Sequence, residues 1–216
     1  SKRVSIIMLG TKILEERTSK YNGHLRVLKT FGMGTYIQSN GLTQSGGIVE
    51  SIWKSALRQI KNKQSLPLRG KKILILGLGG GTLAKLLRKK YPESTITGIE
   101  IDSLMIELGK KYLNLDDFNT EIIIKDVRKM KFKKNSFDLI IVDMYQGDNF
   151  PREFESEKFI ESIKKALTKN GTVIINRLYF GDKRPDTVRF GNKLEKLFSK
   201  VKWFYPEANL MFICEP

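Results

Sequence analysis

From residue 71 onward, short apolar runs alternate with segments whose apolar residues recur every three or four positions. The first kind of pattern predicts buried strands and the second predicts helices that bury one face. Strands separated by helices form right-handed crossovers and a parallel sheet. The predicted strands cover residues 71–77, 94–102, 120–126, 137–143 and 172–178, and the predicted helices cover 82–91, 103–113 and 156–168, with Ser103 as the cap of the second helix and Asn170-Gly171 ending the third.

The C-terminal pattern differs, because its last two apolar runs have no helix between them. A helix is predicted over 187–198, followed by strands at 201–205 and 210–214. The four residues that join these strands are too few for a helical crossover, so the last strand should run antiparallel. We therefore expect an α/β fold, a Rossmann-like doubly wound sheet that is mostly parallel and has an antiparallel C-terminal strand.

The first 70 residues have a different texture, with short strands expected at 4–9, 24–30 and 34–39. Asn40-Gly41 is a strong turn signal, and Ile48, Ile52, Ala56 and Ile60 follow at the four-residue spacing of a helix. A polar, proline-containing connector covers 62–70. We predict a small β-rich region with a helix at residues 1–66 and a Rossmann-like domain at 67–216.

The composition of the chain bears on its cellular location, on metal binding and on its partners. No apolar run approaches the length of a membrane-spanning helix, and the opening residues lack a signal-peptide pattern, so we expect a cytoplasmic protein. Cys214 is the single cysteine and His24 the single histidine, which argues against a metal site. The formal net charge of +16 favours anionic partners such as nucleic acid, but basic residues recur along the whole chain, as on solvated surfaces.

Candidate binding residues follow the predicted parallel strands, where open α/β sheets bind their ligands. The run "GLGGGT" from Gly77 follows the first strand, Glu100 ends the second, Asp126 ends the third and Asp143 ends the fourth. Glycines allow close approach of a ligand, and a carboxylate at Glu100 can accept both ribose hydroxyls. An NAD site has the same two features. A carboxylate at Asp126 that could accept an adenine amino group, together with the antiparallel ending of the sheet, resembles class I adenosylmethionine-dependent transferases. This resemblance favours adenosylmethionine over NAD.

Longer stretches make the resemblance more specific. The segments "ILGLGGGTLAKLL", "ITGIEID", "FDLIIVDMYQGDNFP" and "NGTVIIN" resemble the spermidine synthase family, and "SKYNGHLRVLKTFGMGTYIQSNGLTQ" resembles its small N-terminal β-region. The resemblance implies a class I adenosylmethionine-type fold, a glutamine at the cofactor nucleoside and a homodimer. It places cofactor contacts at Gln44, Gly77, Gly79, Gly80, Glu100, Ile101, Asp126, Val127 and Asp143.

Several positions depart from an aminopropyltransferase. The resemblance places an aspartate for the cofactor amine where this chain has Gly80, and a second aspartate after the fourth strand where it has Gln146. The helix that should open with an Asp-Glu pair and a Tyr-His-Glu group carries Val49-Glu50 and Trp53-Lys54-Ser55 instead. Fewer carboxylates disfavour a polycationic acceptor. A glycine at position 80 was expected to leave room for the carboxylate of intact adenosylmethionine.

These observations lead to one first hypothesis and two alternatives. The first is an adenosylmethionine-dependent methyltransferase with an unidentified acceptor, in which Asp143 is the base or orienter and Tyr145 and Trp53 are candidate substrate contacts, although both also fit packing roles. The second is an aminopropyltransferase that uses decarboxylated adenosylmethionine. The third is a nucleoside-binding or scaffold protein without catalysis.

Overall fold

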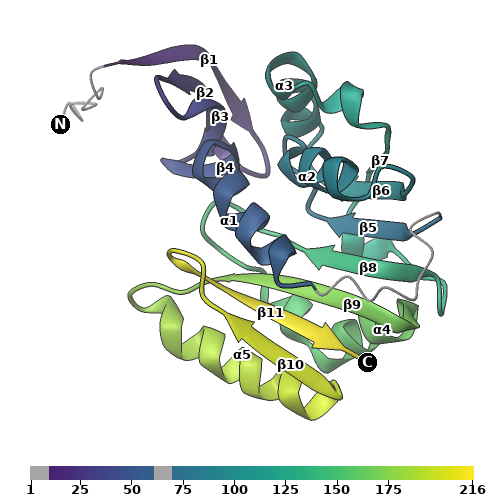
Figure 1. The fold of residues 1–216 in the computed structure, drawn as a ribbon. Helices are drawn as coiled ribbons and strands as arrows, with labels where there is room; N and C mark the ends of the chain where they lie inside the picture. The colour runs from purple at the N-terminus through teal and green to yellow at the C-terminus, as the bar shows by residue number, and fades with distance from the viewer. Residues whose placement is uncertain (1–9, 61–69) are drawn as a thin grey trace.

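The computed structural model describes residues 10–60 and 70–216, which form two sheets (Figure 1). The first sheet is antiparallel, with four strands in the order β1-β2-β3-β4. The predicted strand at 4–9 and the predicted domain boundary lie outside the described residues. The strands are β1 (Thr11–Ser19), β2 (Gly23–Thr30), β3 (Gly34–Ser39) and β4 (Leu42–Gly46), and helix α1 (Gly47–Arg58) follows.

The N-terminal sheet contains two strands that the pattern of apolar residues did not predict, β1 and β4. Both are largely exposed or half-buried, so their sequences lack an apolar face. The predicted turn joins β3 to β4, and Asn40 and Gly41 both have left-handed backbones (φ 48° and 90°). Two such residues in succession are what a tight hairpin requires.

The second sheet has seven strands in the order β10-β11-β9-β8-β5-β6-β7. The pairs among β9, β8, β5, β6 and β7 are parallel, and β11 runs antiparallel to both β9 and β10. The predicted fold class is therefore confirmed. The strands are β5 (Lys72–Leu76), β6 (Thr95–Glu100), β7 (Thr120–Ile124), β8 (Phe137–Val142), β9 (Leu167–Leu178), β10 (Lys200–Phe204) and β11 (Asn209–Glu215).

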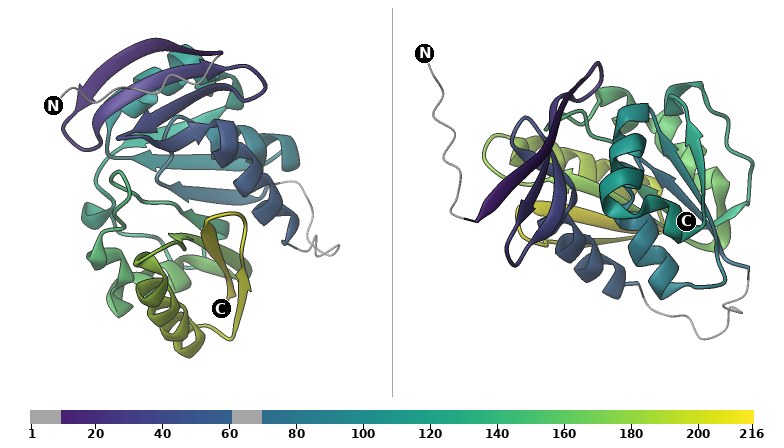
Figure 2. Two further views of the ribbon diagram at one scale, coloured as in Figure 1. Left: turned by 90° about the vertical axis from the view of Figure 1, so that its left-hand side faces the viewer. Right: turned by 90° about the horizontal axis from the view of Figure 1, so that it is seen from above.

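Helices cover both faces of this sheet, as Figure 2 shows from two further directions. They are α2 (Thr82–Lys90), α3 (Ser103–Leu113), α4 (Glu157–Ala166) and α5 (Lys183–Leu197), with the short 3₁₀ helices η1 (Leu115–Phe118), η2 (Val127–Lys129) and η3 (Arg152–Glu155). In β5, Leu74 and Leu76 join the core beneath α4 and α5, whereas Ile73 and Ile75 join the core beneath α1 and α2. This strand is apolar throughout because both of its faces are covered.

A third, smaller core attaches the N-terminal sheet to α3. Leu25, Val27 and Ile37 of β2 and β3 pack there against Met105 and Leu108. All five side chains are buried, so this sheet is fixed beside the carboxyl ends of the parallel strands.

Two predicted helix boundaries were wrong. Asp102, not Ser103, caps α3, because its side chain accepts a hydrogen bond from the Leu104 N–H at 3.0 Å. Helix α4 ends at Ala166, and Asn170-Gly171 lies within β9.

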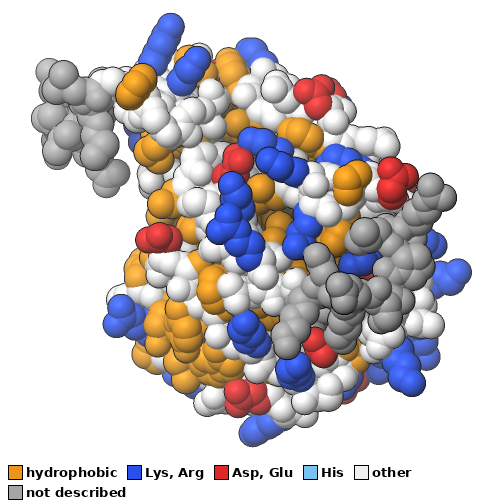
Figure 3. All heavy atoms as spheres, viewed as in Figure 1, with side chains coloured by type: hydrophobic (Ala, Val, Ile, Leu, Met, Phe, Trp, Pro, Cys, Tyr) orange, Lys and Arg blue, Asp and Glu red, His pale blue; other side chains and the backbone are white. Residues whose placement is uncertain are grey.

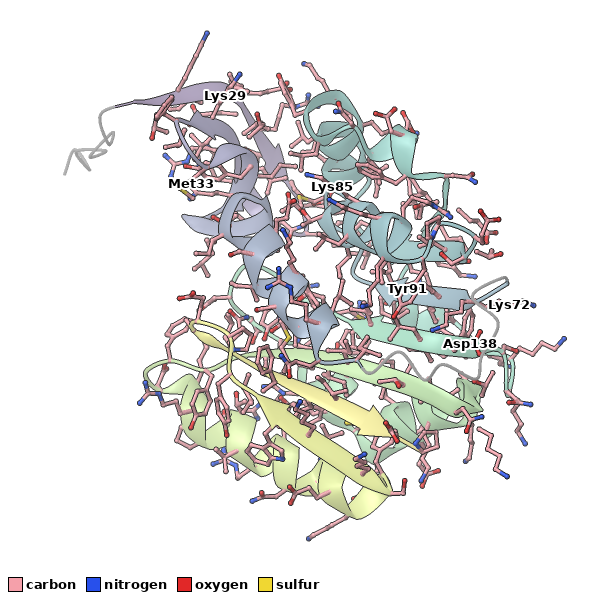
Figure 4. All side chains as sticks on the ribbon, viewed as in Figure 1. Lys29, Met33, Lys72, Lys85, Tyr91 and Asp138 are labelled. Carbon is pink, nitrogen blue, oxygen red and sulfur yellow. The ribbon has the colours of Figure 1, made fainter. Side chains whose placement is uncertain are left out.

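At the end of the sheet where the strands begin, the Lys72 N–H donates to Asp138 Oδ2 at 3.0 Å, and both residues are labelled in Figure 4.

Candidate active site

The order of the strands reverses between β5 and β8, which is where doubly wound sheets bind ligands. Gly77 follows β5 and Asp143 follows β8. Gly77 has φ 89°, and a Cβ placed on it would lie 2.2 Å from the Asp143 carbonyl oxygen. The two strand ends are therefore packed so closely that position 77 admits only glycine.

A cavity of about 490 Å³ opens at this reversal. Its walls come from both sheets, since β4, α1 and the ends of β5, β6, β8 and β9 all contribute residues. The structure brings together ten of the predicted site residues in its lining, namely Gln44, Trp53, Gly77, Gly79, Glu100, Ile101, Asp126, Val127, Asp143 and Tyr145.

Gly80 is the predicted cofactor contact that does not line the cavity. A Cβ on Gly80 would lie 2.8 Å from Ile37 Cδ1 and 2.9 Å from Leu113 Cδ1, and the Gly80 N–H donates to Ser45 Oγ at 2.8 Å. The loop turns this position toward the N-terminal sheet and α3. The expectation that Gly80 leaves room for a cofactor carboxylate was wrong, because protein side chains fill that space.

Glu100 is held at one end of the cavity by backbone donors. Its Oε2 accepts from the Gly79 N–H at 2.8 Å and its Oε1 from the Asp102 N–H at 3.0 Å. Burial raises the pKa of the Glu100 carboxyl, and the two backbone hydrogen bonds oppose that rise. The glycine loop and the end of β6 thus fix one carboxylate in a position to accept hydroxyl donors.

The same end of the cavity is tied to the turn between β1 and β2. Asp102 Oδ2 accepts from Asn22 Nδ2 at 2.7 Å and from Ser19 Oγ at 2.5 Å. Asn22 also lines the cavity. Sequence reasoning missed this link, because it joins residues 80 and more positions apart.

Asp126 forms an ion pair that sequence reasoning also missed. Both of its carboxylate oxygens accept from Arg128 Nε, at 3.0 and 2.9 Å, and the Arg128 guanidinium also reaches Glu153 at 2.9 Å. The hydrogen bond from the Arg128 side chain lowers the pKa of the Asp126 carboxyl. Asp126 also caps η2 by accepting from the Arg128 N–H, so the ion pair and the cap use one residue.

Asp143 lies at the other end of the cavity with both carboxylate oxygens engaged by neutral donors. The indole N–H of Trp53 donates to Oδ2 at 2.9 Å, and the Asn176 amide donates to Oδ1 at 2.8 Å. Burial raises the pKa of the Asp143 carboxyl, and these two hydrogen bonds oppose the rise. No ion pair joins Asp143 to a cationic side chain within residues 10–60 and 70–216.

The donors around Asp143 are themselves fixed. Asn209 Nδ2 donates to Asn176 Oδ1 at 2.9 Å, which orients the Asn176 amide with its nitrogen toward Asp143. The Tyr145 hydroxyl accepts from the Leu178 N–H at 2.7 Å, and burial raises the pKa of the Tyr145 hydroxyl. Tyr145 is therefore a wall of the cavity held by its own hydroxyl.

Gln44 closes the cavity from the side of the N-terminal sheet, since its Nε2 donates to the Gly147 carbonyl at 3.1 Å.

In the described parts of the chain, no cluster of three or more histidine, cysteine or carboxylate side chains is arranged to hold a metal ion. None of the described helices is both long and apolar enough to cross a bilayer.

Comparison with known proteins places this chain in a family. The model of a methyltransferase domain matches residues 68–206. The chain therefore belongs to the methyltransferase-domain family. Its fold is that of spermidine synthases: a probable spermidine synthase from Corynebacterium glutamicum superposes with a TM-score of 0.75 at 20% identity, covering 94% of this chain and 79% of that one.

Two further similarities point to different transferases. The chain is 31% identical over 110 residues to a probable polyamine aminopropyl transferase from Bifidobacterium longum, which covers 50% of this chain and 24% of that protein. Human methyltransferase-like protein 13, solved in complex with SAH, superposes with a TM-score of 0.63 at 22% identity, covering 77% of this chain and 81% of that one. The predicted resemblance to spermidine synthases is confirmed.

Proposed function

We propose that this chain transfers an alkyl group from the sulfonium of an adenosylmethionine-type donor to an amine nitrogen, and that the group is aminopropyl. The observation that carries the proposal is the Asp143 carboxylate, which is half-buried at the cavity wall and whose hydrogen-bond donors among the described residues are the neutral groups of Trp53 and Asn176. A buried carboxylate without a cationic partner is costly, and a bound ammonium or sulfonium would offset that cost.

The nucleoside end of the cavity supports the donor. Glu100 is fixed by two backbone N–H groups with its carboxylate at the cavity wall, where it would accept the ribose hydroxyls. Asp126 would accept the adenine amino group beside the backbone of Val127, which lines the same wall. The human relative bound to SAH and the spermidine synthase fold both agree with a donor of this class.

The chemistry at the other end is a direct displacement. The lone pair of the acceptor nitrogen attacks the carbon attached to sulfur, the carbon–sulfur bond breaks, and the sulfonium becomes a neutral thioether. The attacking amine must first lose a proton, and the Asp143 carboxylate, which lines the cavity, would take it. Its raised pKa suits a general base, because a proton acceptor works best when its pKa approaches the working pH.

Methyl transfer is the second candidate, and Gly80 favours it. The spermidine synthase resemblance places there the aspartate that holds the donor amine, whereas Ile37 and Leu113 occupy the space around Gly80 in this chain. Without an aspartate to hold the donor amine, the site lacks one feature that would select decarboxylated adenosylmethionine over intact adenosylmethionine. The curated relative named as an aminopropyl transferase weighs on the other side.

The products separate the two candidates. Aminopropyl transfer converts decarboxylated adenosylmethionine to methylthioadenosine, and methyl transfer converts adenosylmethionine to S-adenosylhomocysteine. We would incubate the protein with each donor and a set of diamines, and follow both thioethers by mass spectrometry, with Asp143→Asn as the control. Methylthioadenosine formed only by the unmodified protein supports aminopropyl transfer. S-adenosylhomocysteine alone would establish the methyl alternative, and the absence of both products would exclude transfer to these diamines.

A further inference from the structure

A concentrated basic segment follows β7, the strand at one edge of the seven-stranded sheet. Six of the ten residues at 125–134 are lysine or arginine and one is acidic, whereas 39 of 216 residues are basic in the whole chain. The single acidic residue, Asp126, is paired with Arg128. The lysines of the segment therefore contribute a local excess of positive charge that the proposed transfer does not use.

The segment presents its lysines in a regular row. Lys129, Lys131 and Lys133 are exposed, while Met130 and Phe132 between them are half-buried and pack against the core beneath α4 and α5. Met130 has an extended backbone (φ −100°, ψ 148°). Alternate residues of an extended chain are roughly 7 Å apart. None of these three lysines forms an ion pair with another described residue.

A groove of about 380 Å³ begins where the row begins and contains an aromatic side chain. Tyr21 lines it, with the Lys20 ammonium 4.7 Å from the ring centroid. Lys125 and Lys129 line its other side, and Ile124 beside them is 54% exposed. The groove adjoins the cavity described above, because Ile101, Lys125, Asp126 and Arg128 line both.

We propose that this groove and the lysine row from Lys129 to Lys133 bind single-stranded nucleic acid. Proteins that bind such strands combine a basic track for the phosphates with aromatic rings on which bases stack, and this surface has a row of lysines and one aromatic ring, that of Tyr21. The net charge of +16 would add long-range attraction for a polyanion. This inference goes beyond the proposed transfer and does not depend on it.

Basic side chains also gather over α1 and α2 on the face shown in Figure 3. That face differs from the lysine row in the pairing of its charges. Lys85, labelled in Figure 4, is paired with Glu50 at 2.9 Å, which offsets its positive charge, although Tyr112 and Phe118 line the groove beside it. Lys54, Arg58 and Lys89 on these two helices are exposed and provide a matched control for the row.

The test compares two variants with the same net charge. One carries Lys129→Gln, Lys131→Gln and Lys133→Gln, and the other carries Lys54→Gln, Arg58→Gln and Lys89→Gln. Binding of a fluorescein-labelled oligouridylate of twelve nucleotides is followed by anisotropy between 50 and 200 mM salt, about the range over which phosphate contacts are lost. Circular dichroism establishes that both variants are folded.

We expect the row variant to weaken binding at least about ten-fold and to reduce the slope of log K against log salt by about 2, since each lost phosphate contact contributes about 0.7. The control variant should keep most of its affinity. Tyr21→Ala should weaken binding about five-fold or more, the effect of losing one stacked base. No binding by the unmodified protein, or equal losses in both charge variants, would overturn the proposal. Displacement of the oligonucleotide by polyglutamate at equal charge would point to an acidic protein instead.

Discussion

Replacing Trp53 with phenylalanine tests the role of the hydrogen bond that holds Asp143. The change keeps a smaller aromatic ring in a position that is 1% exposed and removes the indole N–H, which donates to Asp143 Oδ2 at 2.9 Å. The donor stabilises the ionised carboxylate and so lowers its pKa against the effect of burial. Its loss should raise the pKa of the Asp143 carboxyl further.

The size of this change follows from the strength of the bond. A hydrogen bond to a charged group contributes about 1.5–3 kcal/mol, and one pKa unit corresponds to about 1.36 kcal/mol. Because Asp143 is half-buried and its donor Trp53 is 1% exposed, solvent screens the interaction less than it would at the surface. We therefore expect an upward shift of about 1–2 units.

The assay is a pH titration of the carboxyl carbons of aspartate by NMR, with the Asp143 signal assigned through Asp143→Asn. Trp203→Phe is the matched control, since the Trp203 indole donates at the same 2.9 Å to Glu195 on the exposed surface. It should leave the Asp143 titration unchanged. An Asp143 pKa that stays the same or falls in Trp53→Phe would refute the assignment of Trp53 as its stabilising donor.

Three further predictions concern the rest of the site. Asn209→Ala should lower the transfer rate without changing the Michaelis constant for the donor, because it frees the Asn176 amide to rotate away from Asp143; unchanged steady-state kinetics would argue against this. Gly80→Ala should lower the free energy of unfolding by about 1–3 kcal/mol in urea titrations, because a Cβ there would lie within 3.0 Å of Ile37 and Leu113, and full stability would contradict the packing described. Arg128→Gln should raise the pKa of the Asp126 carboxyl toward its ordinary value, because the ion pair that lowers this pKa is lost. Donor binding by the variant should then be weaker at pH 4–5, about the range where an unpaired aspartate titrates, than at pH 7. An unchanged pH dependence of donor binding would show that the ion pair does not control the Asp126 pKa.

The sheet could be predicted from the sequence because its strands are uniformly apolar and its helices are amphipathic. Four predicted strands each end in a candidate binding feature, namely the glycine loop, Glu100, Asp126 and Asp143. The topology alone therefore places these features together at the carboxyl ends of the parallel strands. The strands β1 and β4 could not be found in the same way, because neither has a continuous apolar face. Their positions depend on pairing with β2 and β3.

The contacts within the site depend on distances that no local pattern encodes. Trp53 was expected as core or as a substrate contact, and it is a buried donor to a residue 90 positions away. Gly80 was expected at the cofactor, and the loop turns it toward Ile37 and Leu113. Asn176 lies two residues before the end of a predicted strand, which pairs with β8, so its proximity to Asp143 is the one such contact that the strand order could have indicated.

Calorimetry of the two donors tests the central proposal most directly. Decarboxylated adenosylmethionine and adenosylmethionine would each be titrated into the unmodified protein and into Glu100→Gln, which keeps the shape of the side chain and removes its charge. We predict tighter binding of the decarboxylated donor, weakened about ten- to a hundred-fold in the variant by the loss of charged hydrogen bonds worth about 1.5–3 kcal/mol. Tighter binding of intact adenosylmethionine would contradict aminopropyl transfer, and no binding of either would contradict the donor site itself.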